Sequence, residues 1–327
     1  MKCFKITFIL LSFIFSQCNN DSAAYKGFTI QGKNLVDGNG NAFIIKGVNN
    51  PHIWFPKKAY DALPAIAEKN VNTIRVVWMT QGRISLLDSI LSKCIELEMI
   101  PMVELHDATG DSSTSRLVAM AAYFVLPEVK HVLDKYEQFL LINIANEWGN
   151  HSVSNEKWFE AYKTAVDTLR KAGYRNTIVV DAPGWGQNID PFIEYGQQLI
   201  QYDTLKNILL DVHMYGSWNE ADSVKSKIEQ VYSLNLPLII GEFGYNFNDG
   251  QNNLGCKVNH KVVMEIGDKY GYGYLPWSWT GNNEENAWLD LVEYNDWKTL
   301  TWWGSEVFEG ENGISATAIK ASIFKTE

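Results

Sequence analysis

Two glutamates, Glu147 and Glu242, each follow a short apolar run that predicts a buried strand. The first run, Leu140–Ala145, is rich in branched side chains and leads through Asn146 into Glu147, and the second, Leu236–Gly241, leads into Glu242. Such runs are typical of parallel strands that are buried on both faces. Because the carboxyl ends of barrel strands meet at one rim, we expect the two carboxylates to face one cavity.

A pair of carboxyl groups at one rim can hydrolyse a glycosidic bond. When the groups lie about 5–5.5 Å apart, one attacks the anomeric carbon and the other protonates the leaving oxygen, so that the configuration is retained. The acid needs a raised pKa, and the nucleophile must remain ionised. We assign Glu147 as the acid/base and Glu242 as the nucleophile.

Polar residues at other predicted strand ends could support these two groups. In this prediction Arg75 and Tyr215 keep Glu242 charged and oriented, through a charge-assisted bond and a phenol donor respectively. Asn146 donates to the sugar 2-hydroxyl, a bond that strengthens in the transition state. His213 modulates the acid/base. We expect this set to form one hydrogen-bonded network, because buried polar groups cost free energy unless they are partnered.

His106 ends another predicted strand and is expected to be a further supporting residue, although such a residue in isolation could simply be a satisfied core group. The chain also holds 12 Trp, more than a core usually needs. Flat indole faces suit the apolar faces of sugar rings, although a given tryptophan can equally be a core residue. The predicted substrate-binding residues are Trp78, Trp185, Trp277, Trp279 and Asn282, with Trp277 beneath the reacting sugar.

The elements that position these residues alternate between strand and helix. Eight strands are predicted, near Ile44–Val48, Thr73–Trp78, Ile100–His106, Leu140–Ala145, Thr177–Asp181, Ile208–His213, Leu238–Gly241 and Gly273–Trp277. Between them, apolar spacings of three and four residues predict helices over Tyr60–Lys69, Ile84–Glu98, Arg116–Asp134, Asn155–Ala172, Ile189–Tyr202, Ala221–Leu234 and Lys257–Tyr270. This pattern predicts an α/β fold, a (β/α)8 TIM barrel, as a single catalytic domain over residues 25–327. Two small hairpins over Phe28–Ile45 are expected to close its bottom.

Composition excludes some classes of partner. The chain has 327 residues, 46% of them hydrophobic, and a formal net charge of −10 with no cluster of Lys and Arg. Nucleic acid is therefore a poor partner, since binding it needs a concentrated basic patch. A neutral substrate fits better, and we expect a monomer without a cofactor or metal. No His/Cys spacing resembles a structural zinc site, and a disulfide between Cys94 and Cys256 is possible, although two free thiols are expected.

Residues 1–21 are predicted to be an export signal. Lys2 and Lys5 flank the apolar run Ile6–Phe15, which is too short to span a membrane as a stable helix. Cys18 resembles the modified cysteine of a bacterial lipoprotein, and cleavage near Ala23 or Ala24 is the alternative. We therefore expect a secreted protein or a cell-surface lipoprotein, with a lipid on Cys18 as the only membrane attachment.

The motifs at the strand ends carry a resemblance to a known family. They are Asn146-Glu147, His213-Met-Tyr215, Gly241-Glu242-Phe-Gly, Arg75-Val-Val-Trp78, Val103-Glu-Leu-His-Asp-Ala-Thr-Gly110, Ile142-Asn-Ile-Ala-Asn-Glu-Trp148, Asp181-Ala-Pro-Gly-Trp-Gly-Gln187 and Pro276-Trp-Ser-Trp-Thr-Gly-Asn282. From about Gly32 to Gly313 the chain resembles glycoside hydrolase family 5, whose members are retaining (β/α)8 enzymes, and within it the bacterial endo-β-1,4-mannanases. Thr280 departs from the lysine that is usual in these relatives, and we expect this position to touch outlying sugars.

The resemblance implies the same roles at the matching positions: acid/base for Glu147, nucleophile for Glu242, and support from Arg75, His106, Asn146, His213, Tyr215 and Trp277. It implies a retaining endo-β-1,4-mannanase that acts on mannan, glucomannan or galactomannan. An endo-β-1,4-glucanase with the same two glutamates is the alternative, since glucose and mannose differ only at C2. An inactive surface glycan-binding barrel and a metal-dependent barrel hydrolase are further alternatives. The first would lack one of the carboxylates, and the second would need more ligands beside its histidines.

Overall fold

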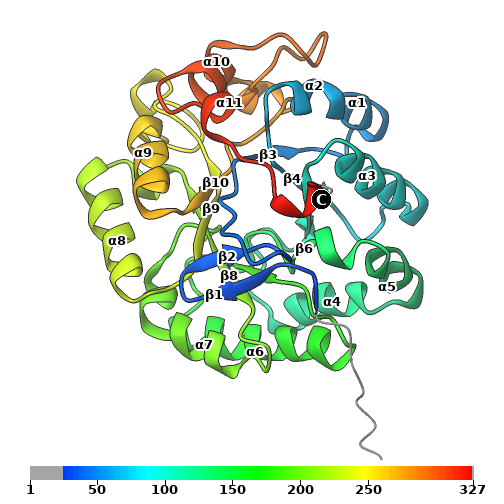
Figure 1. Ribbon diagram of the computed structural model, residues 1–327. Coiled ribbons are helices and arrows are strands. Elements are labelled where there is room, and N and C mark those ends of the chain that lie inside the picture. The colour runs from blue at the N-terminus through cyan, green and yellow to red at the C-terminus, as the bar shows by residue number, and fades with distance from the viewer. Residues whose placement is uncertain (1–24, 326–327) are drawn as a thin grey trace, which may run out of the picture.

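The computed structural model describes residues 25–325, so the predicted export signal and Cys18 lie outside the described residues. Its centre is an eight-stranded parallel sheet in the order β3-β4-β5-β6-β7-β8-β9-β10, curled into a barrel inside a ring of helices (Figure 1). An isolated parallel bridge between Lys46 and Tyr274 joins the first and last of these strands. The strands are β3 (Gly47–Asn50), β4 (Thr73–Trp78), β5 (Ile100–Leu105), β6 (Leu141–Asn143), β7 (Ile178–Asp181), β8 (Ile208–Met214), β9 (Leu238–Phe243) and β10 (Gly273–Tyr274).

The predicted (β/α)8 barrel is confirmed, and the differences lie at strand ends. Strand β4 has the predicted bounds, whereas β3 begins at Gly47 rather than at Ile44, whose side chain is exposed. Strand β10 ends at Tyr274 instead of reaching Trp277. Pro276 has no N–H to donate, so it cannot extend the ladder.

Helices cover the outside of the barrel at the predicted places. They are α1 (Pro56–Asp61), α2 (Leu63–Glu68), α3 (Ile84–Glu96), α4 (Thr114–Phe124), α5 (Pro127–Asp134), α6 (Asn155–Lys171), α7 (Gln197–Tyr202), α8 (Ala221–Ser233), α9 (His260–Tyr270), α10 (Trp302–Glu309) and α11 (Ile314–Thr317). The single helix predicted over Arg116–Asp134 is two, because Pro127 disfavours a helical conformation at Leu126 and starts α5. A π-helical turn, Phe192–Gly196, precedes α7.

The N-terminal hairpin closes the bottom of the barrel, as predicted. Strands β1 (Thr29–Gln31) and β2 (Asn34–Val36) pair antiparallel around Gly32, whose φ of +62° is left-handed. The second predicted hairpin is reduced to one bridge between Val36 and Ala42. The aromatic side chains of Phe28 and Phe43 pack against the first inward-facing residues of the strands, which form one apolar cluster with them: Ile100, Met102, Leu141, Val179, Leu209, Ile239 and Leu275.

Above this apolar cluster the barrel interior becomes polar. The inward-facing residues nearer the carboxyl ends of the strands are wholly buried yet carry amide or charged groups: Asn49, Arg75, Glu104, Asn143, Asp181, Asp211 and His213. Such groups are stable in a core only when they are partnered. The layer of mutual partners that they form is the floor of the site described below.

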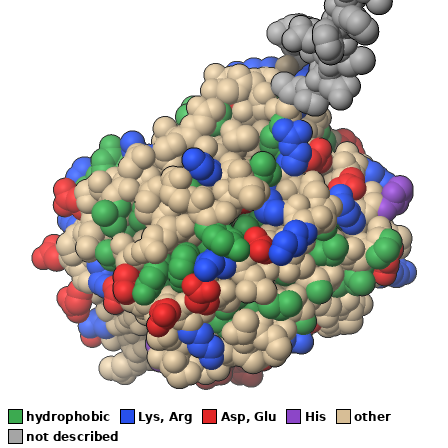
Figure 2. Space-filling view, turned by 90° about the horizontal axis from the view of Figure 1, so that it is seen from below, with side chains coloured by type: hydrophobic (Ala, Val, Ile, Leu, Met, Phe, Trp, Pro, Cys, Tyr) green, Lys and Arg blue, Asp and Glu red, His purple; other side chains and the backbone are tan. Residues whose placement is uncertain are grey.

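One face of the molecule carries charges of both signs (Figure 2). On the side seen in Figure 2, acidic and basic side chains are interspersed and no broad basic patch is visible. Among residues 25–325 no helix combines the length and the apolar character needed to cross a membrane. Cys94 and Cys256 are buried and unbonded to each other, as expected.

Candidate active site

Glu147 and Glu242 converge at the carboxyl end of the barrel. Glu242 lies near the end of β9, and Glu147 lies in the loop after β6 with a left-handed φ of +47°. The Glu147 amide donates to Asp181 Oδ2 at 2.9 Å, which holds this unusual backbone conformation. One carboxylate oxygen from each glutamate and a ring nitrogen of His213 lie within 4.8 Å of one another.

The surroundings of Glu242 favour its charged form. Its Oε1 accepts from Arg75 Nη1 and its Oε2 from the Tyr215 hydroxyl, each at 2.8 Å. Burial alone would raise the pKa of Glu242, but the positive charges of His213 and Arg75 outweigh burial and lower it. The result is an ionised carboxylate that points into the cavity, as a nucleophile requires.

The surroundings of Glu147 act in the opposite direction. Burial raises the pKa of Glu147 above its ordinary value, and the nearby charge of Glu242 adds to this, while the contact with His213 opposes it. Glu147 Oε1 lies 2.9 Å from His213 Nδ1. Two neighbouring carboxyl groups with pKa values pushed apart are the arrangement of a general acid beside a nucleophile.

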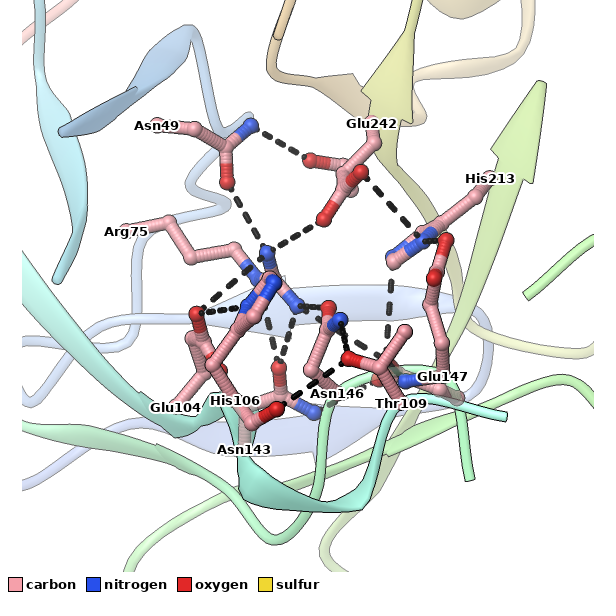
Figure 3. Close-up of polar contacts among 12 residues, drawn as sticks. Asn49, Arg75, Glu104, His106, Thr109, Asn143, Asn146, Glu147, His213 and Glu242 are labelled. Carbon is pink, nitrogen blue, oxygen red and sulfur yellow. Dashed lines mark hydrogen bonds and ion pairs between the residues drawn. The ribbon is translucent and has the colours of Figure 1, made fainter. Parts of the chain in front are cut away.

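Arg75 is the centre of the polar layer, as Figure 3 shows. Its guanidinium donates to Glu242, to Asn49 Oδ1 at 2.9 Å and to Asn146 Oδ1 at 2.7 Å. Both Nε and Nη2 donate to Asn143 Oδ1. The wholly buried cation is thus held on several sides, which fixes the orientation of the Glu242 carboxylate.

Asn146 and His106 occupy neighbouring positions on the same rim. Asn146 is buried, and its Nδ2 donates to Thr109 Oγ1 at 2.8 Å, so its contact with a sugar hydroxyl stays a prediction. His106 Nδ1 lies 3.0 Å from Glu104 Oε1, and its ring stacks on Trp277 with centroids 5.8 Å apart. The charge of Glu104 outweighs burial and raises the pKa of His106.

A cavity of about 430 Å³ opens above the two glutamates. A second cavity of about 720 Å³ continues on the far side of Trp277, where Trp54, Phe55, Asn282 and Tyr294 line it. Trp277 lies between the two, with its Nε1 donating to Asn282 Oδ1 at 2.8 Å. The first cavity is lined by His106, Glu147, Trp185, Gln187, Tyr215, Glu242, Asn253, Leu254, Trp277, Asn286 and Leu289.

Two predicted substrate contacts are wrong. Trp78 is wholly buried on the outside of the barrel wall, where its Nε1 donates to the Tyr123 hydroxyl at 3.1 Å. Trp279 is also wholly buried, and its Nε1 donates to the carbonyl of Trp297. The position of Trp78 follows from the alternation of side chains along β4, which turns every second residue away from the barrel interior. Trp279 lies beyond the end of β10, where the chain is no longer a strand and the alternation does not apply.

Two further predictions need correction or refinement. Thr280 was expected to touch outlying sugars, but it is wholly buried, so this expectation is wrong. Asn282 lines the second cavity, but its amide nitrogen donates to Ser278 and Asp290 and its oxygen accepts from Trp277. Its position therefore suits holding the Trp277 ring in place.

Several residues of the site were missed by the sequence reasoning. Asn49, Glu104, Asn143 and Asp211 all face the barrel interior and were not singled out. A signal exists for Glu104, Asn143 and Asp211, since each of them interrupts an otherwise apolar run, whereas Asn49 lies just after the predicted first strand. The cavity-wall residues Gln187, Asn253 and Leu254 lie in loops and Asn286 lies in a short 3-10 helix, where no periodic pattern marks them.

Comparison with known proteins gives the family. The model described as cellulase (glycosyl hydrolase family 5) matches residues 36–283. A mannan endo-1,4-beta-mannosidase of Salipaludibacillus agaradhaerens is 37% identical over 306 residues, which are 91% of this chain and 96% of the relative. A mannan endo-1,4-beta-mannosidase of Cellvibrio japonicus is 34% identical over 311 residues, which are 92% of this chain and 70% of that protein.

A solved structure agrees with these relatives. The mannohexaose complex of Thermomonospora fusca beta-mannanase matches with a TM-score of 0.83 at 34% identity, covering 92% of this chain and 100% of that one. The family model spans most of the chain, and the barrel and the paired glutamates are those that a retaining glycosidase needs. This chain belongs to glycosyl hydrolase family 5, a family of retaining glycoside hydrolases.

Proposed function

We propose that this protein is an endo-β-1,4-mannanase that hydrolyses internal bonds of mannan with retention of configuration. The observation that carries the proposal is the convergence of Glu147 and Glu242, with carboxylate oxygens within 4.8 Å. This separation suits double displacement, because inverting enzymes keep their carboxyl groups about 6.5–9.5 Å apart to leave room for a water. The named relatives are mannanases, which supports mannan as the substrate.

In the first step Glu242 attacks the anomeric carbon while Glu147 gives its proton to the leaving oxygen. The lowered pKa of Glu242 and the raised pKa of Glu147 support these roles. In the second step Glu147, now ionised, takes a proton from water, which attacks the same carbon and releases Glu242. Nucleophile, acid and base are all side chains, so the reaction calls for no metal or cofactor.

The cleft supports endo action on a polymer. The cavity above the glutamates and the one beyond Trp277 follow one another along the rim, and both are open to solvent. Trp277 between them presents an indole face on which a pyranose ring can stack. We further propose that the protein is exported and acts outside the cytoplasm, as the predicted signal over residues 1–21 suggests.

Release of reducing sugar from mannan and from carboxymethylcellulose tests the substrate. We expect release from mannan, with the β-anomer as the first product seen by ¹H NMR before mutarotation. Glu242→Gln, which keeps the shape of the side chain, should abolish release while the thermal unfolding curve stays cooperative. Release from carboxymethylcellulose alone would support the endoglucanase alternative, and an initial α-product would refute retention.

A further inference from the structure

A second group of acids lies beneath the two glutamates and has no part in the mechanism above. Asp181 at the end of β7 and Asp211 on β8 are both wholly buried. His213 lies between these acids and the glutamates. Its Nε2 is 3.6 Å from Asp181 Oδ2 and 3.8 Å from Asp211 Oδ2, while its Nδ1 faces Glu147.

Two atoms of this group are buried without a hydrogen-bond partner. They are His213 Nε2 and Asp211 Oδ2, which face each other. A lone pair on Nε2 would lie against two carboxylate oxygens and be repelled by them. An N–H at that position would be attracted to both, so the geometry favours a proton on Nε2.

The backbone around this group is shaped to admit it. A Cβ added to Gly241 would lie 2.1 Å from Asp211 Oδ2, so only a glycine leaves room for this carboxylate. A Cβ added to Gly186 would lie 2.5 Å from His213 Cγ, so a second glycine makes room for the ring. The Gly241 amide also donates to Asp211 Oδ1, which fixes the carboxylate under the histidine.

We propose that Asp211, together with Asp181, is a positioning residue that keeps His213 positively charged, and that this charge sets the pH range over which the two glutamates work. The roles of the glutamates in this inference rest on the proposed function. Asp211 acts only through His213, because its carboxylate lies below the ring and does not line the cavity.

The groups that face His213 come from four parts of the barrel. They are Glu147 from the loop after β6, Asp181 from β7, Asp211 from β8 itself and Glu242 from β9, whose Oε2 lies 3.7 Å from Nδ1. Burial of the imidazole disfavours its charge. The surrounding acids, Glu242 and Asp211 foremost, outweigh burial and hold the pKa of His213 well above its ordinary range.

The sign of the effect can be derived from these contacts. The charge on His213 lowers the pKa of Glu242 and opposes the rise in the pKa of Glu147. If the ring became neutral, both pKa values would rise, and both limbs of the pH profile of kcat/KM would move to higher pH. Loss of the Asp211 charge acting directly on the glutamates would have the opposite sign, since a lost negative charge lowers both pKa values.

Asp211→Asn therefore distinguishes an effect through His213 from a direct effect on the glutamates, because the two move the limbs in opposite directions. The variant keeps an oxygen that can accept from the Gly241 amide. NMR of ¹⁵N-histidine-labelled protein, with His213→Gln to assign the signal among the six histidines, reports the ring directly. In the unmodified protein we expect both ring nitrogens of His213 to be protonated at pH 7. In Asp211→Asn the pKa of His213 should fall far enough for the ring to lose its proton within the working pH range, and both limbs of the profile should then move to higher pH.

The control is Asp190→Asn, which removes one charge at an exposed position paired with Lys227 and should change neither readout. A neutral His213 ring at pH 7 in the unmodified protein would overturn the proposal, whether or not Asp211→Asn folds. Limbs that stay in place or move to lower pH in that variant would also overturn it. The NMR measurement needs no substrate, so its failure is distinct from failure of the proposed function.

Discussion

Removal of the acid/base side chain gives the strongest test of the site. In Glu147→Ala the catalytic proton and the partner of His213 Nδ1 are lost, while Glu242 keeps Arg75 and Tyr215. General acid–base catalysis contributes about 10²–10⁴-fold, which is about 3–5 kcal/mol of transition-state stabilisation. We therefore expect kcat/KM on mannan to fall by about that factor, with little change for a dinitrophenyl β-mannobioside, whose leaving group departs without a proton.

Addition of azide to Glu147→Ala tests from which side each glutamate approaches the anomeric carbon. Glu147 and Glu242 approach the anomeric carbon from opposite sides of the reacting bond. Azide in the space vacated by Glu147 should therefore restore turnover of the activated substrate and give the β-mannosyl azide. The matched variant Glu242→Ala should give the α-azide instead. An α-azide from Glu147→Ala, or an equal loss of activity on both substrates, would refute the assignment.

Four further outcomes follow from the contacts described. Tyr215→Phe removes one hydrogen bond to charged Glu242, worth about 1.5–3 kcal/mol, so kcat should fall and the acid limb of the kcat/KM profile should move to higher pH. In the unmodified protein that profile should be bell-shaped, falling at low pH as Glu242 is protonated and at high pH as Glu147 loses its proton; a flat alkaline limb would contradict the raised pKa of Glu147. Trp78→Ala should lower the free energy of unfolding by about 3–5 kcal/mol and leave KM unchanged. Trp277→Ala should raise KM instead, and the reverse pattern in calorimetry and kinetics would show that the two tryptophans are wrongly placed.

The barrel could be predicted from the sequence because the signals for its strands and helices are local. Apolar runs and three- and four-residue spacings marked each strand and helix, and the strand ends marked both glutamates. The predicted boundaries of helices and strands differ from the observed ones where a proline intervenes, as at Pro127. They also differ where the strand is only two residues long, as in β10. In these places a backbone constraint overrides the hydrophobic pattern.

The parts of the site that were not predicted depend on contacts across the barrel. Trp78 and Trp277 each end a predicted strand, and only the direction of each side chain decides that one lies in the core and the other lines the cavity. Asp211 and Asn143 matter because they meet partners on the next strand of the barrel, which are 30 and 38 residues away in the sequence. A single sequence does not reveal such pairings, although polar residues in apolar strands indicate that partners must exist.

The hairpin at the bottom of the barrel also fixes where the chain can be joined to something else. The Ser322 amide donates to Asp37 Oδ2 at 2.7 Å, and Phe324 stacks on Phe139, so the last described turn packs beside the hairpin that begins at Thr29 (Figure 1). Both ends of the described chain therefore leave from the side opposite the catalytic rim. A support, a fusion partner or a surface attached at either end would leave the mouth of the cleft free to meet a long, insoluble polymer.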